Sequence, residues 1–174
     1  ASGNVGRKII EILEKSKISF KDLYLVASKK SAGKKIKFRE KEIEIENLEN
    51  YDFSKAQITI FAAGSDIAKE WAPKAAKKTI VIDNSSFFRM QKNIPLVVPE
   101  VNPEALYKHE NIIANPNCST MQMVLALKPL HDEYKIKRVI VSTYQAVSGA
   151  GKEAMDELFD QTKSFLNKKN IVSK

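Results

Sequence analysis

The sequence predicts an α/β fold with a doubly wound, mainly parallel sheet, followed by the beginning of an α+β domain. Three observations lead to this prediction. Short apolar runs typical of buried strands recur along the 174 residues, segments with helical periodicity stand between them, and polar, turn-forming motifs follow several strands directly. Strands that alternate with helices in this way form parallel sheets, which bind ligands beyond the carboxyl ends of their strands.

Each expected element follows from its own pattern. Val5, Ile9, Ile12 and Leu13 recur at helical spacing and predict a helix over residues 4–15. Further helices are expected over 65–78, where Pro73 should end or kink the helix, and over 101–108, 118–132 and 150–167. Strands are expected over 22–27, 57–63, 79–83, 111–115 and 136–145, with a hairpin over 36–38 and 41–46 and extended chain at 94–98.

The composition excludes several classes of protein. A single cysteine rules out an internal disulfide and a multi-cysteine zinc site, and no ligand cluster in the sequence supports a metal. No apolar run approaches the ~20 residues that cross a bilayer, so we expect no membrane association. Without a signal peptide, a cytoplasmic setting is the expectation.

The formal net charge of +8 raises nucleic-acid binding as an alternative function. Only four of the 29 basic residues are arginines, and the lysines are mixed with glutamates, so a solvated lysine surface explains the charge better. We therefore expect no nucleic-acid partner. An anionic small-molecule substrate would also benefit from this positive field.

The chain opens inside a motif. ASGNVG, residues 1–6, ends in the pattern G-x-x-G, and the first helix follows at once. Such a turn lets main-chain N–H groups approach a diphosphate, although it also fits a simple glycine-capped helix start. A phosphate-binding turn follows a strand, and no strand precedes this one. We therefore expect the sequence to be a fragment of a longer protein, or a set of residues taken from one.

A basic loop follows the strand expected at 22–27. In dinucleotide-binding folds, an acidic residue at this place binds the ribose 2′-hydroxyl of NAD. The motif SKKSAGKK, residues 28–35, instead offers cations and hydroxyls, among them Lys30 and Ser31. This composition suits a 2′-phosphate and therefore NADP, while a solvated basic loop is the alternative interpretation.

The lone cysteine stands at the start of an expected helix. In NPNCST, residues 115–120, Pro116 breaks the preceding strand and Cys118 opens the helix, whose N-terminus stabilises a thiolate nucleophile. Asn117 and nearby amides are candidates for holding an oxyanion. A lone cysteine is usually a small buried hydrophobe, but a polar, turn-forming segment is not typical of a core.

TYQAVSGAGK, residues 143–152, follows the long strand expected at 136–145. Gln145 can hydrogen-bond a substrate there, and Ser148 and Gly149 lie in a turn where main chain can approach a ligand. A plain strand–helix connector with glycine for its turn is the alternative interpretation.

Arg89 in IDNSSFFRM, residues 82–90, also follows a strand. Arginine binds phosphate or carboxylate through its planar fork, and a surface salt bridge is the alternative. His109 and His131 do not lie in strand-end loops and are poor candidates for a catalytic base.

Together these segments resemble the aspartate-β-semialdehyde dehydrogenase family. The resemblance covers nearly the whole chain, and its most specific part is NPNCST together with TYQAVSGAG. It implies a Rossmann-like NADP-binding domain over residues 1–116 that lacks its first strand. It further implies the truncated start of a catalytic and dimerisation domain over 117–174, in a protein that is usually a homodimer at full length. The motifs that carry the resemblance are the N-terminal glycine turn, KKSAGK, VIDNSSFFRM with PLVVPEVN, IIANPNCSTMQMV and VSTYQAVSGAGKEAMDEL.

The resemblance also implies a reaction. The family reduces β-aspartyl phosphate to aspartate semialdehyde with NADPH and releases phosphate, on the route to lysine, threonine, methionine and, in bacteria, diaminopimelate. Cys118 would attack the acyl phosphate to form a thioester. Arg89, Asn117 and Gln145 would bind or orient the substrate. The residues that the resemblance places at NADP are Ser2, Gly3, Asn4, Val5, Lys30, Ser31, Ser148 and Gly149.

The sequence departs from the family pattern in three ways. Lys30 replaces the usual arginine, the first strand is absent, and the chain stops before the family's catalytic histidine and substrate-binding arginine. We therefore expect this fragment alone to be inactive. An N-acetyl-glutamyl-phosphate reductase-like enzyme and a non-catalytic dinucleotide-binding module are the alternatives. Glyceraldehyde-phosphate dehydrogenase fits less well, because its cysteine motif differs.

Overall fold

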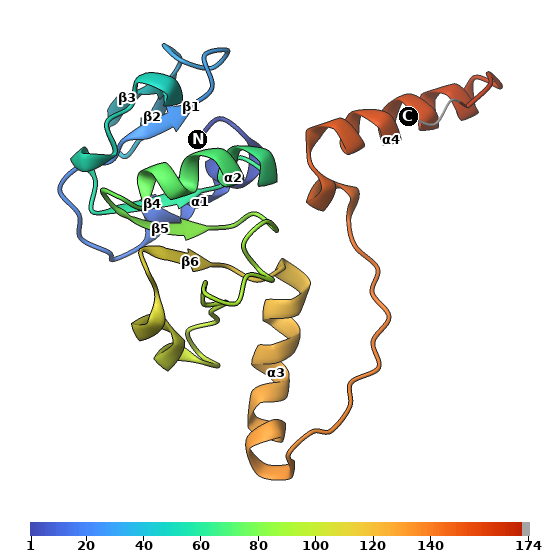
Figure 1. Ribbon diagram of the computed structural model, residues 1–174. Helices are drawn as coiled ribbons and strands as arrows, with labels where there is room; N and C mark the ends of the chain where they lie inside the picture. The colour runs from blue at the N-terminus through green and yellow to red at the C-terminus, as the bar shows by residue number, and fades with distance from the viewer. Residues whose placement is uncertain (172–174) are drawn as a thin grey trace. The chain divides into compact units, whose positions relative to one another are not determined.

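A computed structural model describes residues 1–171 of the chain (Figure 1). The described residues divide into two compact units, one of Ala1–Ile136 and one that begins at Lys137. The first unit contains α1 (Asn4–Lys15), β1 (Leu25–Ala27), β2 (Lys35–Phe38), β3 (Lys41–Asn47), β4 (Ile58–Phe61), α2 (Ser65–Ala75), β5 (Ile80–Asp83), β6 (Ile112–Ala114) and α3 (Cys118–Tyr134). The second contains a short 3₁₀ turn at Val147–Ala150 and α4 (Lys152–Leu166).

The six strands form two three-stranded sheets. One sheet has the order β4-β5-β6 and is parallel throughout. The other has the order β1-β3-β2, in which β1 runs parallel and β2 antiparallel to β3. The pairing of Ile36 with Ile43 confirms the hairpin expected from the alternation of isoleucine and glutamate. The α/β fold with mainly parallel strands is thus confirmed.

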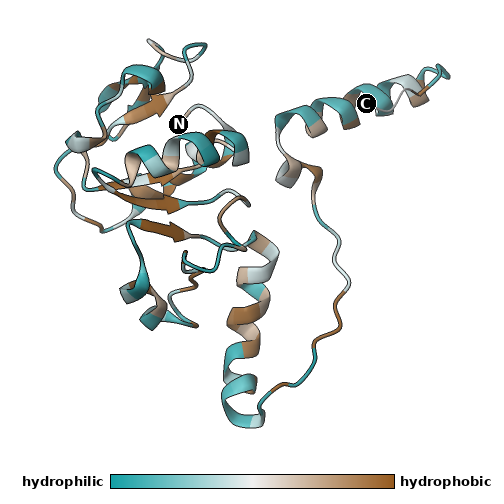
Figure 2. Cartoon of the chain, in the orientation of Figure 1, coloured by the Kyte–Doolittle hydropathy of each residue, from teal (hydrophilic) through white to brown (hydrophobic). Residues whose placement is uncertain are grey.

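Each sheet packs on one helix through a small apolar core. Ala68, Ala72 and Ala75 of α2 are almost fully buried, and their small side chains let the helix lie close to β4 and β5. Ile10 of α1 packs with Leu25 and its neighbours in the other sheet. Figure 2 shows the hydrophobic residues concentrated in the strands β4, β5 and β6. Burial of these faces fixes which side of each sheet its helix covers.

Two helices contain a proline. Helix α2 begins at Ser65 and ends at Ala75, two residues after Pro73, rather than at residue 78. Helix α3 runs to Tyr134 through Pro129 and ends at Lys135, whose φ of 53° is left-handed. An interior proline has no N–H to donate to the carbonyl four residues earlier, and its ring crowds that carbonyl. Helix α2 ends soon after its proline, whereas α3 continues to Tyr134.

The strand expected over residues 136–145 is wrong for this structure, which has no regular element there. Its apolar residues are exposed: Val139 by 48%, Ile140 by 84% and Val141 by 57%. A strand forms only when its N–H and C=O groups pair with a neighbour, and no strand within residues 1–171 pairs with this segment. The apolar residues of this segment therefore favour a strand, but they do not show which other strand would pair with it.

Candidate functional site

The carboxyl ends of β4, β5 and β6 meet at one edge of the parallel sheet, and hydrogen bonds join the loops that leave them. The main-chain N–H of Asn84 donates to the oxygen of Phe61, 2.9 Å away, and that of Asn115 donates to the oxygen of Asp83 at 2.8 Å. The side chains of Asn115 and Asn84 also meet, Nδ2 to Oδ1, at 2.5 Å. These bonds make the loop after β5 and the loop after β6 a single framework.

Arg89 is part of this framework. Its Nε donates to the main-chain oxygen of Asn115 at 3.0 Å, and its Nη2 donates to that of Asn84 at 3.2 Å. The guanidinium is half-buried, and within residues 1–171 no carboxylate lies within 4.0 Å of it. Its orientation is therefore set by neutral carbonyl groups, and its positive charge is not neutralised by an ion pair.

Cys118 is the first residue of α3 and is exposed, so it is not the buried hydrophobe of the alternative interpretation. Asn117 precedes it as the N-cap, and its Oδ1 accepts the N–H groups of Ser119 at 3.0 Å and Thr120 at 3.4 Å. The cap uses the oxygen of Asn117 and not its amide Nδ2. The sequence places this thiol three residues after Asn115, to which Arg89 is bonded.

The N-terminal turn has the features expected of a phosphate-binding turn. Gly3 is the N-cap of α1, and the first turn of the helix contains no acidic residue. The N–H of Arg7 donates to the oxygen of Gly3 at 2.9 Å, and the nitrogen of Ala1 lies 2.7 Å from the oxygen of Val26. The turn therefore lies next to β1, with the positive end of α1 free of negative side chains. The predicted cofactor residues Ser2, Gly3, Asn4 and Val5 all belong to this turn and the first turn of α1.

The packing around Gly6 explains why the G-x-x-G pattern has glycine at its last position, residue 6. It is buried, and a Cβ at this position would lie 2.8 Å from the main-chain oxygen of Ala1. Gly3, in contrast, would accept a Cβ with no atom within 4 Å. The close approach of main chain at Gly6 thus requires glycine for packing.

The loop after β1 contains Lys30 and Ser31. It is a tight turn in which the N–H of Ser31 donates to the oxygen of Ser28 at 2.8 Å. Lys30 is exposed and Ser31 is half-buried. Together with Lys29 they offer two cations and a hydroxyl group, and no acidic residue stands in residues 28–35. This donor set fits a phosphate group better than a neutral ribose hydroxyl pair.

Gln145, Ser148 and Gly149 lie in the second unit. The side chain of Gln145 lies against Gly149, so a Cβ at Gly149 would strike its amide nitrogen. The structure therefore brings these three predicted residues together locally.

Four residues of the strand-end framework were not among the predicted site residues: Asp83, Asn84, Ser85 and Asn115. A signal existed, because D-N-S and N-P-N directly follow buried runs at two strand ends. No spacing rule reveals, however, that the two asparagines hydrogen-bond across 31 positions.

Residues 1–171 contain neither a membrane-spanning helix nor a cluster of metal ligands. No helix there has the length and apolar character needed to cross a membrane. Histidine, cysteine, aspartate and glutamate side chains also form no group of three that could hold a metal ion.

Two family models and several curated proteins match the chain. A family model described as "Semialdehyde dehydrogenase, NAD binding domain" matches residues 1–109, and one described as "Semialdehyde dehydrogenase, dimerisation domain" matches residues 127–173. Aspartate-semialdehyde dehydrogenase 2 of Vibrio cholerae is 49% identical over 170 residues, which are 96% of this chain and 50% of that protein. The chain spans about half the length of the curated relatives it matches.

Solved structures give the same result. Aspartate semialdehyde dehydrogenase II from Vibrio cholerae, complexed with ASA, superposes with a TM-score of 0.93 at 46% identity, covering 100% of this chain and 53% of that one. The enzyme from Candida albicans, with NADP, has a TM-score of 0.68 at 27% identity, covering 78% of this chain and 46% of that one. The chain therefore belongs to the semialdehyde dehydrogenase family of oxidoreductases, with an NAD(P)-binding domain followed by part of the dimerisation domain.

Proposed function

We propose that this chain belongs to an enzyme that reduces β-aspartyl phosphate to aspartate semialdehyde with NADPH and releases phosphate. The observation that carries the proposal is the framework at the strand ends, in which Arg89 is bonded to Asn115, just before the exposed Cys118. The relatives of known name support the same substrate. We place the division between cofactor-binding and catalytic domains at residues 116 and 117, between β6 and α3.

In this proposal the thiolate of Cys118 attacks the acyl carbon of the substrate. The carbon–oxygen bond to phosphate breaks, phosphate leaves, and a thioester to Cys118 remains. Bound NADPH supplies the hydride that reduces this thioester. The bond between the acyl carbon and the sulfur of Cys118 then breaks, which releases the aldehyde and regenerates the thiolate. Arg89 binds the phosphate group through its guanidinium, and the Nδ2 of Asn117 donates to the oxyanion of the acyl carbon. Gln145 orients the substrate.

The proposed cofactor site has two parts. Main-chain N–H groups of residues 2–5, at the N-terminus of α1, bind the diphosphate. Lys30 and Ser31 bind the 2′-phosphate of NADP, and the family resemblance assigns Ser148 and Gly149 to the same cofactor. Titration calorimetry tests this assignment. We expect Lys30→Glu to weaken NADP binding by about tenfold or more and to affect NAD little, because the added carboxylate repels only the 2′-phosphate.

We further propose that the protein forms a homodimer. Support comes from the match of residues 127–173 to the dimerisation domain and from the exposed Leu158, Phe159, Phe165 and Leu166 of α4. Light scattering of the protein as encoded by its complete gene tests this proposal. A monomer at micromolar concentration would contradict it.

The decisive experiment measures NADPH formation from aspartate semialdehyde, NADP and phosphate by the protein from its complete gene. We expect turnover that depends on phosphate and that Cys118→Ser abolishes, while NADP binding stays unchanged. N-acetyl-glutamate semialdehyde serves as the comparison substrate. Absence of turnover with intact NADP binding would favour a non-catalytic nucleotide-binding role instead.

A further inference from the structure

The last residue of strand β5, Asp83, has a buried carboxyl group that the proposed reaction does not use. Asp83 is fully buried, and its Oδ1 has no hydrogen-bond partner among residues 1–171. Apolar residues of the core, among them Val81 and Phe88, flank it along the chain. A carboxylate in such a place is costly, and an unpartnered buried oxygen calls for an explanation beyond packing.

The other carboxyl oxygen, Oδ2, shapes the loop that follows. The hydroxyl of Ser85 donates to it at 2.6 Å, and the same hydroxyl accepts the N–H of Phe87 at 3.2 Å. Ser85 is itself buried. These two hydrogen bonds, both made by the hydroxyl of Ser85, connect the end of β5 to the middle of the loop formed by residues 84–90.

Arg89 lies near the end of this loop. Phe88 is buried in the core beside it, and Arg89 bonds back to the main-chain oxygens of Asn84 and Asn115. The positive charge of Arg89 opposes the rise that burial produces in the pKa of Asp83, so the two groups interact electrostatically. No direct ion pair within 4.0 Å joins them, however. A direct pair would neutralise the guanidinium, whereas a connection through Ser85 leaves its charge for an anion.

We propose that Asp83 is a positioning residue which, through the hydroxyl of Ser85, holds loop 84–90 so that Arg89 is oriented for the phosphate group of the substrate. The inference rests on the proposed function, because that function supplies the phosphate. It adds two residues, Asp83 and Ser85, that do not touch the substrate but determine how well Arg89 is oriented to bind the phosphate group.

The chain contains a matched control for this device. Asp52 and Ser54 repeat the same D-x-S pattern: the hydroxyl of Ser54 donates to the Oδ2 of Asp52 at 2.8 Å. That turn is exposed and lies outside the strand-end framework. Ser86→Ala provides a second control, because its hydroxyl lies in the same loop as Arg89 but contacts Ser65, at 2.9 Å, instead of Asp83.

The test uses the protein from its complete gene and measures kcat and the Michaelis constant for phosphate in the NADPH-forming direction. We expect Asp83→Asn and Ser85→Ala to raise that constant about 10- to 100-fold with a smaller effect on kcat. Ser85→Thr retains the hydroxyl and should recover most of the loss. Asp52→Asn and Ser86→Ala should leave both constants within about twofold of the wild type.

A second readout follows Arg89 without turnover. In ¹⁵N NMR, the Nε–H of Arg89 is expected to exchange slowly in the wild type and at least about tenfold faster in Asp83→Asn and Ser85→Ala. Unchanged exchange and an unchanged phosphate constant in both variants would overturn the inference. If Arg89→Lys also leaves the phosphate constant unchanged, the phosphate role of Arg89 falls, which is a failure of the proposed function itself.

Discussion

The side-chain oxygen of Asn117 accepts the main-chain N–H of Ser119 at 3.0 Å, so the residue before Cys118 begins the helix that carries the thiol. This relationship gives Asn117 two separable tasks. Its oxygen caps α3, and in the proposed reaction its amide nitrogen donates to the oxyanion.

Substitution of Asn117 separates the two tasks. Asn117→Ala removes the cap and should lower the free energy of unfolding by about 1 kcal/mol, measured in urea. Asn117→Ser keeps an oxygen that can cap and should leave stability nearly unchanged. Both variants lose the amide donor, so we expect kcat to fall by about 10²–10³ in each. Wild-type kcat in Asn117→Ser would show that the residue is a cap and nothing more.

Gly6 is expected to tolerate no side chain. In Gly6→Ala the new Cβ would meet the main-chain oxygen of Ala1 at 2.8 Å, and main chain cannot yield as a flexible side chain does. We expect a loss of about 1–3 kcal/mol in stability by thermal unfolding, with weaker NADP binding by calorimetry. Gly3→Ala is the matched comparison, because its Cβ meets nothing within 4 Å. An equal loss in both variants would contradict the steric explanation.

The pKa of Asp83 predicts an unusual pH dependence. Burial raises this pKa above its ordinary value in the folded protein, so the ionised carboxyl destabilises the fold at neutral pH. Asp83→Asn should therefore raise Tm at pH 7, and the difference should shrink as pH falls through the raised pKa.

The pKa of Asp52, which stands in the same D-x-S pattern, is shifted in the opposite direction. Hydrogen bonds from Ser54 lower the pKa of Asp52, so its stabilising contribution is present above the unfolded value and is lost as pH falls through the folded one. Asp52→Asn should consequently lower Tm slightly at pH 7. If Asp83→Asn lowers Tm as Asp52→Asn does, the carboxyl of Asp83 stabilises the fold and does not destabilise it.

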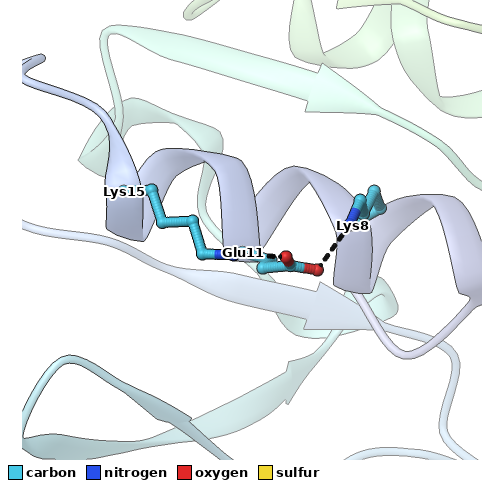
Figure 3. A network of polar contacts seen from close by, with 3 residues as sticks. All are labelled: Lys8, Glu11 and Lys15. Atoms are coloured by element: carbon cyan, nitrogen blue, oxygen red, sulfur yellow. Dashed lines mark hydrogen bonds and ion pairs between the residues drawn. The ribbon is translucent and has the colours of Figure 1, made fainter.

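Helix α1 carries a network of three side chains on its exposed face (Figure 3). Glu11 accepts hydrogen bonds from Lys8 at 2.8 Å and Lys15 at 2.7 Å, and these bonds lower the pKa of Glu11 to about 2. Its contribution to stability is therefore present above the ordinary pKa of glutamate and disappears as pH falls toward 2. Because all three side chains are exposed to solvent, we expect the contribution to be small.

Thermal unfolding of Glu11→Gln between pH 2 and pH 7 measures this contribution. The variant should lose a small part of the wild-type acid sensitivity, and 1 M salt should erase the difference at pH 7. Glu40→Gln, an exposed substitution outside the network, is the control. A difference that survives high salt would mean that the network acts by something other than screened charge.

Local pattern was enough to predict part of this fold. The spacing of apolar residues marks α1 because its contacts repeat every turn, and alternation of Ile43 and Ile45 with glutamate marks the hairpin. Segment 136–145 shows the limit of such reasoning. Its apolar run, Val139 to Val141, predicts a strand, but pairing is a property of two segments, and no strand in the described chain pairs with this one.

The candidate site divides in the same way. The place of Cys118 at a helix start was predictable from adjacent residues, whereas the capping role of Asn117, expected only to hold an oxyanion, comes from the structure. Arg89 was predictable as a residue type after a strand, but its bonds to Asn84 and Asn115 depend on register between β5 and β6. Asp83 was not predicted as functional, since its significance lies in burial, which three-dimensional packing decides.

The unpaired stretch after α3 has a practical consequence for handling the protein. Residues 137–146 form no regular element, and Lys137 and Arg138 within it are exposed, as the main-chain recognition of a protease requires. Brief treatment with a trace of trypsin should cut this chain there before it cuts inside the helices. The products would be two pieces that correspond to the two compact units, and purifying the larger one would give a sample of both sheets and the N-terminal glycine turn by itself.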